Sequence, residues 1–189
     1  VTVEGETRLL SQPFLVLATQ NPVEFEGTFP LPDAQLDRFL VELTLGYPTP
    51  EEEAQMLFAL RGAHPIDSIG QVVDGARLTE LQRTIWDVHL QDSLRDYIIR
   101  LANATRAHPD LALGASPRAT FALYRASQAL AALAGREYVI PDDIKALIGP
   151  VWRHRLLVRP ESALRGRSAE AILAGVLAET TLDLGENNA

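Results

Sequence analysis

The sequence changes character at residue 49. Before this point lie two apolar runs of strand length, residues 14–19 and 39–45. A continuous apolar run is typical of a strand that is buried on both faces of a parallel sheet. After this point the chain carries a series of helix-start signals. We therefore predict a mainly α fold, in which a partial α/β core (residues 1–48: a hairpin plus two strands) precedes an all-helical domain (residues 49–189).

Local signals place the expected elements. Alternating residues 1–4, a turn at Gly5 and a return strand over residues 7–10 predict the hairpin. Residues 20–32 contain three prolines and are expected to form a loop, before a short helical stretch at residues 33–38. Capping residues and prolines predict helices that start at Thr49, Thr79, Asp92 or Ser93, Ser116, Pro141 and Ala169.

The composition excludes several kinds of function. A formal net charge of −8 argues against nonspecific nucleic-acid binding, which needs a basic face. The absence of cysteine excludes disulfides, zinc thiolate sites and cysteine nucleophiles. No apolar run approaches the roughly 18 residues that cross a membrane. No signal-peptide pattern opens the chain. We expect a cytoplasmic protein with no nucleic-acid partner and no integral membrane segment.

The first candidate functional residue is Asn21, which follows the first apolar run. In α/β sheets, ligands gather at the carboxyl ends of the strands. An amide at that place can hold a water molecule against a phosphate, because it both donates and accepts hydrogen bonds. The alternative is that Asn21 only caps a turn before Pro22.

Two arginines are the other candidates. Arg38 stands between a short helix and the second apolar run, and its guanidinium suits phosphate oxygens, although a surface ion pair is an equal alternative. Arg118 follows Ser116-Pro117 at a helix start, where a cation opposes the helix dipole unless an anion lies between them. The alternative for Arg118 is a solvent-exposed side chain, or a pair with an acid such as Asp110.

Other motifs are absent or weak. The sequence contains no G-x-x-x-x-G-K-[ST] phosphate-binding loop, and its four histidines show no metal-ligand spacing, so no metal site is predicted. The basic clusters at residues 153–155 and 165–167 are interpreted as solvated or salt-bridged surface, and Trp152 as a core residue.

In combination, three motifs resemble the AAA+ ATPases of the MoxR family: ATQNP (residues 18–22), LPDAQLDRF (residues 31–39) and GASPRA (residues 114–119). Four further segments resemble the same family, namely EFEGTFPLP from Glu24, GYPTPEEE from Gly46, YVIPDDI from Tyr138 and WRHRL from Trp152. The resemblance covers nearly the whole chain.

This resemblance implies a site for ATP and Mg²⁺ at the subunit interface of a hexameric homo-oligomeric ring. Asn21 matches the sensor 1 residue and Arg38 matches the arginine finger, both catalytic. Arg118 matches the sensor 2 arginine, which binds the nucleotide from the helical lid. Charge neutralisation of this kind dominates phosphoryl-transfer catalysis. Remodelled client proteins, metal or cofactor insertion and von Willebrand factor A-domain partners are further implications.

The chain departs from the family pattern because the Walker A and Walker B segments are absent. We therefore expect it to be the C-terminal part of an AAA+ module, not to bind Mg·ATP tightly by itself, and to be inactive alone. The strands at residues 14–19 and 39–45 would then lack the neighbour that lies between them in the family. Two alternatives stay open: a helical protein-interaction module without nucleotide chemistry, and a magnesium-chelatase-like or McrB-like AAA+ protein.

Overall fold

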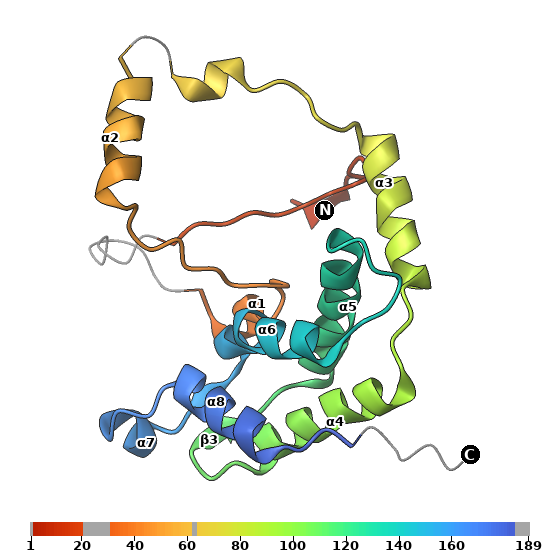
Figure 1. Ribbon diagram of the computed structural model, residues 1–189, viewed down its shortest axis with the longest axis vertical. Helices are drawn as coiled ribbons and strands as arrows, with labels where there is room; N and C mark the ends of the chain where they lie inside the picture. Colours follow the sequence, from red (N-terminus) through yellow and green to blue (C-terminus); the bar gives the residue numbers. More distant parts are fainter. Residues whose placement is uncertain (1, 21–30, 62–63, 184–189) are drawn as a thin grey trace. The chain divides into compact units, whose positions relative to one another are not determined.

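A computed structural model describes residues 2–20, 31–61 and 64–183 (Figure 1). The chain forms two compact units, which are described separately. Unit 1 comprises Val1–Gln20 and Thr44–Arg83, and unit 2 comprises Asn21–Leu43 and Thr84–Ala189. Helices dominate the described residues, which confirms the mainly α prediction. The domain boundary at residue 48 stays a prediction.

Unit 1 begins with the predicted hairpin, although its return strand is Glu6–Thr7 rather than residues 7–10. Strands β1 (Thr2–Val3) and β2 (Glu6–Thr7) pair in antiparallel fashion, with Thr2 opposite Thr7. The turn between them requires Gly5, whose φ is 84°. Positive φ values carry little steric cost in glycine, because it lacks a Cβ atom.

The helices of unit 1 differ in how well their starts were predicted. Helix α2 (Pro50–Ala59) begins with the expected capping box, in which Thr49 Oγ1 accepts from the Glu52 N–H and Glu52 Oε2 accepts from the Thr49 N–H. Helix α3 (Gly75–Thr84) begins earlier than predicted. The side chain of Asp74 accepts from the Arg77 N–H at 2.7 Å, so Thr79 lies inside the helix. A 3₁₀ helix, η1 (Pro65–Ser68), lies between α2 and α3.

The two predicted buried strands are corrected by the structure. Residues 14–19 and 39–45 are not strands, and neither pairs with another strand in the described ranges. Leu15 is 75% exposed and Leu17 is 86% exposed. A strand needs a neighbour to satisfy its backbone N–H and C=O groups, and the described residues supply none at these positions. The apolar pattern therefore marks surface that no described segment covers.

Unit 2 contains the longer helices and a small sheet. The helices α4, α5, α6 and α8 start as predicted, to within one residue, while the sheet was not anticipated. The strands are β3 (Leu111–Leu113) and β4 (Leu157–Val158), which pair in antiparallel fashion. The helices are α1 (Asp33–Leu36), η2 (Ile85–Asp87), α4 (Asp92–Ala107), α5 (Pro117–Leu133), α6 (Pro141–Trp152), η3 (Arg153–Arg155), α7 (Pro160–Leu164) and α8 (Ala169–Glu179).

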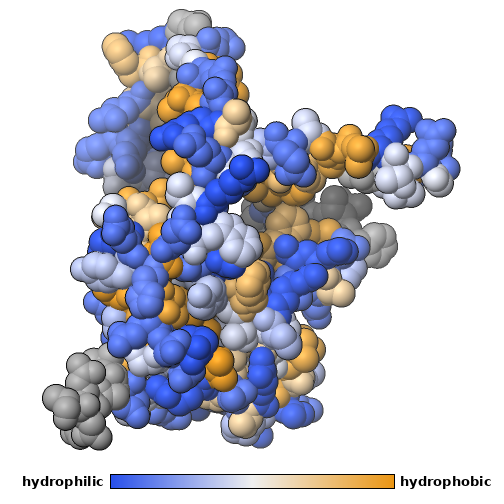
Figure 2. All heavy atoms as spheres, turned by 90° about the vertical axis from the view of Figure 1, so that its right-hand side faces the viewer, coloured by the Kyte–Doolittle hydropathy of each residue, from blue (hydrophilic) through white to orange (hydrophobic). Residues whose placement is uncertain are grey.

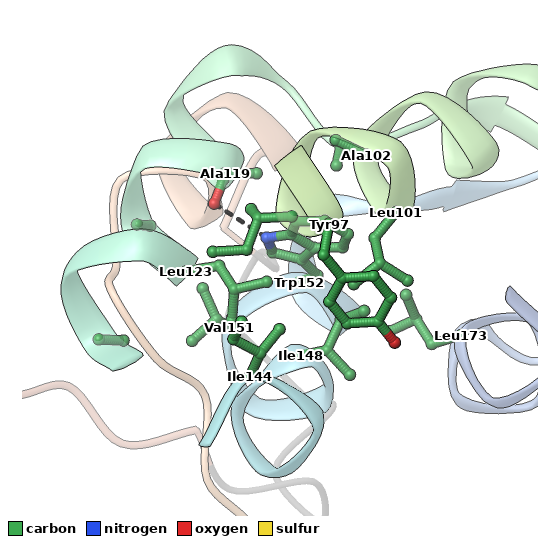
Figure 3. Close-up of a cluster of buried hydrophobic side chains, with 14 of the residues drawn as sticks. Tyr97, Leu101, Ala102, Ala119, Leu123, Ile144, Ile148, Val151, Trp152 and Leu173 are labelled. Atoms are coloured by element: carbon green, nitrogen blue, oxygen red, sulfur yellow. Dashed lines mark hydrogen bonds between the residues drawn. The ribbon is translucent and has the colours of Figure 1, made fainter. Parts of the chain in front are cut away.

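The hydrophobic core of the described residues lies in unit 2, where α4, α5, α6 and α8 meet (Figure 3). Trp152 is fully buried, and its Nε1 donates to the carbonyl oxygen of Ala119 at 2.9 Å. This hydrogen bond joins the end of α6 to the first turn of α5. The other large side chains that are almost fully buried include Tyr97, Ile98, Leu101, Leu123, Ile144, Ile148 and Val151.

Helix α6 has an ion pair at its start. Asp143 accepts from Arg136 Nη2 at 2.6 Å and from the Ile140 N–H at 2.9 Å. Burial raises the pKa of Asp143, but the hydrogen bonds from Arg136 and Ile140 outweigh burial and lower it overall. The first turn of α6 is thus fixed by a charged carboxylate.

The loop before α5 passes very close to α4. A Cβ atom on Gly114 would lie 2.6 Å from both Cα and N of Arg106, so no larger residue fits without backbone movement. The hydroxyl of Thr105 accepts from the Ala115 N–H at 2.9 Å, and Arg106 Nε donates to the Ala115 carbonyl at 2.8 Å. The close approach therefore fixes the backbone from which α5 starts.

Hydrophobic residues also reach the surface, among hydrophilic ones, on the face that Figure 2 presents. No helix in the described part of the chain has both the length and the apolar character needed to cross a membrane.

Replacing Trp152 by Phe tests the link between α5 and α6. The variant removes the hydrogen bond to Ala119 and part of a buried ring, and should lower the free energy of unfolding by about 1–3 kcal/mol. Urea denaturation measures this loss. The control is Trp86→Phe, since Trp86 is 65% exposed. Equal losses in the two variants would contradict a special role for Trp152.

Replacing Gly114 by Ala should destabilise the protein by about 1–3 kcal/mol, because the new methyl group meets backbone atoms that cannot give way. Gly175→Ala is the matched control, because a Cβ there meets no atom of another part of the protein within 4 Å and the site is inside α8. Alanine favours a helix over glycine by roughly 0.5–1 kcal/mol, so this variant should be more stable. Thermal unfolding of both variants should show shifts of opposite sign.

Candidate functional site

The structure describes two of the three predicted site residues. Asn21 lies outside the described residues. Arg38 follows α1 and is exposed, and its side chain has no ion pair or hydrogen bond with any residue in the described ranges. Arg118 is the second residue of α5, and its side chain is 56% exposed. Both arginines belong to unit 2.

The start of α5 explains the position of Arg118. Ser116 Oγ accepts from the Ala119 N–H at 3.1 Å, and Pro117 occupies the first helical position. These two features place Arg118 in the first turn, beside the positive end of the helix dipole. A cation at this position needs a nearby anion to be stable.

That anion is Asp37, not Asp110 as one alternative suggested. Arg118 Nη1 lies 4.0 Å from Asp37 Oδ2, and the Ser116 hydroxyl lies 3.4 Å from Asp37 Oδ1. Asp110 instead accepts from the Ser162 hydroxyl and pairs with Arg167. The acid that directly precedes Arg38 therefore contacts the start of α5.

Residues 37–42, which we call the docked segment, are held by the end of α6 and by the residues that follow it. Arg155 Nη2 donates to the Phe39 carbonyl at 2.6 Å, and Arg155 Nε lies 3.9 Å from Asp37 Oδ1. Arg153 Nε donates to Glu42 Oε1 at 3.1 Å. The Glu42 N–H donates to the Pro150 carbonyl at 2.9 Å. Contacts within unit 2, rather than pairing in a sheet, therefore fix the position of the docked segment.

These contacts correct the interpretation of the basic cluster at residues 153–155. The side chains of His154 and Arg155 are each only 2% exposed, so they are buried rather than solvated. Burial lowers the pKa of Arg155, while Asp37 acts in the opposite direction and Arg118 adds to the lowering. Trp152 is a core residue, as predicted.

His154 contacts the same carbonyl group as Arg155. Its Nε2 lies 3.1 Å from the Phe39 oxygen, and its Nδ1 lies 3.9 Å from Glu42 Oε2. Burial lowers the pKa of His154 below its ordinary value, and the positive charges of Arg155 and Arg153 lower it further. The hydrogen bond to the Phe39 carbonyl and the charge of Glu42 oppose this effect without cancelling it. The imidazole is therefore neutral at pH 7, in the place where it meets the docked segment.

The chemical capacity of the site lies in its cations. Arg38 and Arg118 present exposed guanidinium groups, which suit phosphate oxygens. No group of three His, Asp or Glu side chains in the described ranges could hold a metal ion. The arrangement can bind and neutralise an anion. The sequence analysis did not identify three supporting residues, Asp37, Arg155 and Thr105. Only Asp37 had a local signal, since it adjoins Arg38.

The pKa of His154 predicts a pH dependence of stability. The pKa is lowered in the folded protein, so the unfolded chain binds more protons below its own value of about 6.5. The contribution of neutral His154 to the free energy of unfolding is complete above about pH 6.5. It is lost as the pH falls from there through the folded pKa, by at most about 1.4 kcal/mol per pH unit.

Urea denaturation at about pH 7.5 and about pH 5.5 measures the effect. His154→Gln should reduce the difference between the two conditions. His64→Gln, at an exposed position, should keep it. An unchanged pH dependence in His154→Gln would show that protonation of His154 does not oppose folding.

Comparisons with known proteins agree on one family. Residues 103–176 match the family described as AAA lid domain, and residues 1–41 match the ATPase family associated with various cellular activities (AAA). A crystal structure of a candidate ATPase from Cytophaga hutchinsonii superposes with a TM-score of 0.88 at 35% identity, over 97% of this chain and 58% of that one.

Curated relatives are found in several bacteria. The chain is 46% identical over 177 residues to the uncharacterised protein YeaC of Bacillus subtilis, covering 94% of this chain and 55% of the relative. It is 38% identical over 191 residues to the chaperone MoxR1 of Mycobacterium tuberculosis, covering 96% of this chain and 50% of the relative. It is 35% identical over 164 residues to the protein MoxR of Paracoccus denitrificans, covering 77% of this chain and 48% of the relative. The chain spans about half the length of these relatives, and it belongs to the MoxR family of AAA+ ATPases.

Proposed function

We propose that this chain is the C-terminal part of an ATPase module and supplies three of its nucleotide-sensing residues. The observation that carries the proposal is Arg118, an exposed cation in the first turn of a Ser116-capped helix. A cation there opposes the helix dipole, and its pair with Asp37 is long, at 4.0 Å, so the position still gains from a bound anion. A protein-interaction module has no need of an arginine at this point.

Arg118 acts as the sensor 2 residue in this proposal and contacts the phosphates of the nucleotide bound by its own subunit. Its side chain is 56% exposed, and its pair with Asp37 involves Nη1 at 4.0 Å. The guanidinium has five N–H donors in a fixed fork, so the remaining donors can face a phosphate.

Arg38 acts as the arginine finger on the nucleotide of the neighbouring subunit. Two features support this role: the side chain is exposed, and no described residue pairs with it. An arginine supplied in trans neutralises charge that develops on the transferred phosphoryl group, and this couples hydrolysis to ring assembly.

Asn21 acts as the sensor 1 residue and orients the attacking water. This role stays a prediction, because the residue lies outside the described ranges. The exposed apolar segments at residues 14–19 and 39–45 support a place within a larger sheet, whose other strands lie outside this chain. That sheet would also carry the phosphate-binding loop that the sequence lacks.

The nucleotide is ATP with Mg²⁺, which when bound neutralises charge on the phosphate oxygens. Residues of this chain contribute the cations Arg38 and Arg118, and the metal ligands belong elsewhere in the module. The intact protein forms a hexameric ring that remodels client proteins or inserts cofactors, together with von Willebrand factor A-domain partners. The chaperone name of the relative MoxR1 supports the remodelling role.

The test uses the full-length protein. Arg38→Ala should lower the hydrolysis rate by roughly 10³-fold, the lower end of the effect of arginine fingers, and leave the Kd for ATP nearly unchanged. Arg165→Ala, an exposed arginine in the same unit, is the control. Arg118→Ala should instead weaken nucleotide binding, hydrolysis or both.

Mixing the two inactive variants separates action in trans from action in cis. In a mixed ring, the finger of an Arg118→Ala subunit can act on ATP held by an Arg38→Ala subunit, whose Arg118 is intact. Partial recovery of hydrolysis is therefore expected on mixing. Wild-type turnover in the Arg38→Ala protein would remove Arg38 from the mechanism.

A further inference from the structure

Among the described acids near Arg38 and Arg118, Asp37 has the most side-chain partners. Its Oδ1 lies 3.4 Å from the Ser116 hydroxyl and 3.9 Å from Arg155 Nε, and its Oδ2 lies 4.0 Å from Arg118 Nη1. The carboxylate is 29% exposed, so solvent screens these contacts only in part. One acid thus contacts the start of α5 and the end of η3 at the same time.

The contact with Arg155 is the structural one. The Arg155 side chain is 2% exposed, and its Nη2 also donates to the Phe39 carbonyl. A buried guanidinium needs an acid nearby, because an unpaired buried charge is costly. Arg155 therefore holds residues on both sides of Arg38, namely the side chain of Asp37 and the backbone of Phe39.

The contact with Arg118 is the adjustable one. Arg118 is exposed, the pair is long, and only Nη1 takes part. A phosphate that binds this guanidinium competes with Asp37 for the same positive charge. Phosphate carries more charge than a carboxylate and forks onto arginine equally well, so it draws Arg118 toward itself.

From these contacts we propose that Asp37 is a positioning residue that couples Arg118 to Arg38. It links Arg118, which reads the nucleotide of its own subunit, to Arg38, which acts on the nucleotide of the next. The inference rests on the proposed function of both arginines. Binding of phosphate at Arg118 releases one partner of Asp37 and so changes the placement of the finger that adjoins it.

If Asp37 couples the two arginines, its replacement should change the Kd for ATP and the hydrolysis rate in different ways. In the full-length Asp37→Asn variant, Arg118 no longer faces a competing anion, so the Kd for ATP should stay equal or tighten by up to about fivefold. The finger loses its charged anchor, so the hydrolysis rate should fall by about 10–100-fold. A purely structural defect would weaken binding and rate together.

Matched variants make the outcome decisive. Asp33→Asn removes an exposed acid of the same short helix and should match wild type in affinity and rate. Adding Asp37→Asn to an Arg118→Gln protein should no longer tighten ATP binding, because the competition needs Arg118. Melting temperatures of all variants are measured first, so that loss of fold is recognised.

Asp37→Glu is the conservative variant, and it decides the question if Asp37→Asn does not fold. It keeps the charge on a side chain one methylene group longer, and the long ion pairs tolerate this change. Hydrolysis should remain within about threefold of wild type, with a Kd for ATP that is equal or weaker. Loss of hydrolysis to the level of Arg38→Ala would overturn the proposal.

The result separates this inference from the proposed function. If Arg38→Ala loses hydrolysis while Asp37→Asn behaves like Asp33→Asn, the arginine finger stands and the coupling role of Asp37 is wrong. If Arg38→Ala hydrolyses ATP at the wild-type rate, the proposed function itself fails, whatever Asp37 does.

Discussion

The hydrogen bond from Trp152 to Ala119 joins the two parts of unit 2 on which the site depends. Ala119 follows Arg118 directly, and Trp152 precedes the basic residues of η3 that hold the docked segment. A fully buried indole cannot move without opening a cavity in a close-packed core. The start of α5 and the end of α6 therefore keep a fixed relation, and Asp37 lies where both can contact it.

Features that arise from local interactions could be predicted from the sequence. The capping box of Thr49 with Glu52, and the start of α5 at Ser116 and Pro117, need only residues that lie within one turn of each other. The start of α3 was predicted at the wrong residue because two candidate caps lie close together in the sequence. Thr79 has the spacing of a cap, but Asp74 lies earlier in the chain and captures the first turn.

Features that depend on distant partners could not be predicted. The apolar pattern of residues 14–19 is correct for a buried strand, yet burial requires a neighbouring strand that the described chain does not provide. The cluster at residues 153–155 is charged enough to suggest a solvated surface. It is buried because the Phe39 carbonyl and the Asp37 carboxylate, more than a hundred residues away, satisfy Arg155. Pattern alone gives no sign of such a contact.

The contacts that anchor the docked segment in the described part of the chain do not involve the side chain of Arg38. Unit 2 holds the segment through the side chain of Asp37, the carbonyl of Phe39, and the backbone and side chain of Glu42. None of these contacts uses the guanidinium of Arg38, which stays exposed. In its proposed role as an arginine finger, Arg38 could not also serve as its own anchor, because pairing would neutralise the charge that it has to deliver. Because the anchors are its neighbours, the backbone is fixed while the side chain of Arg38 remains available, and the placement of Arg38 depends on that of Asp37.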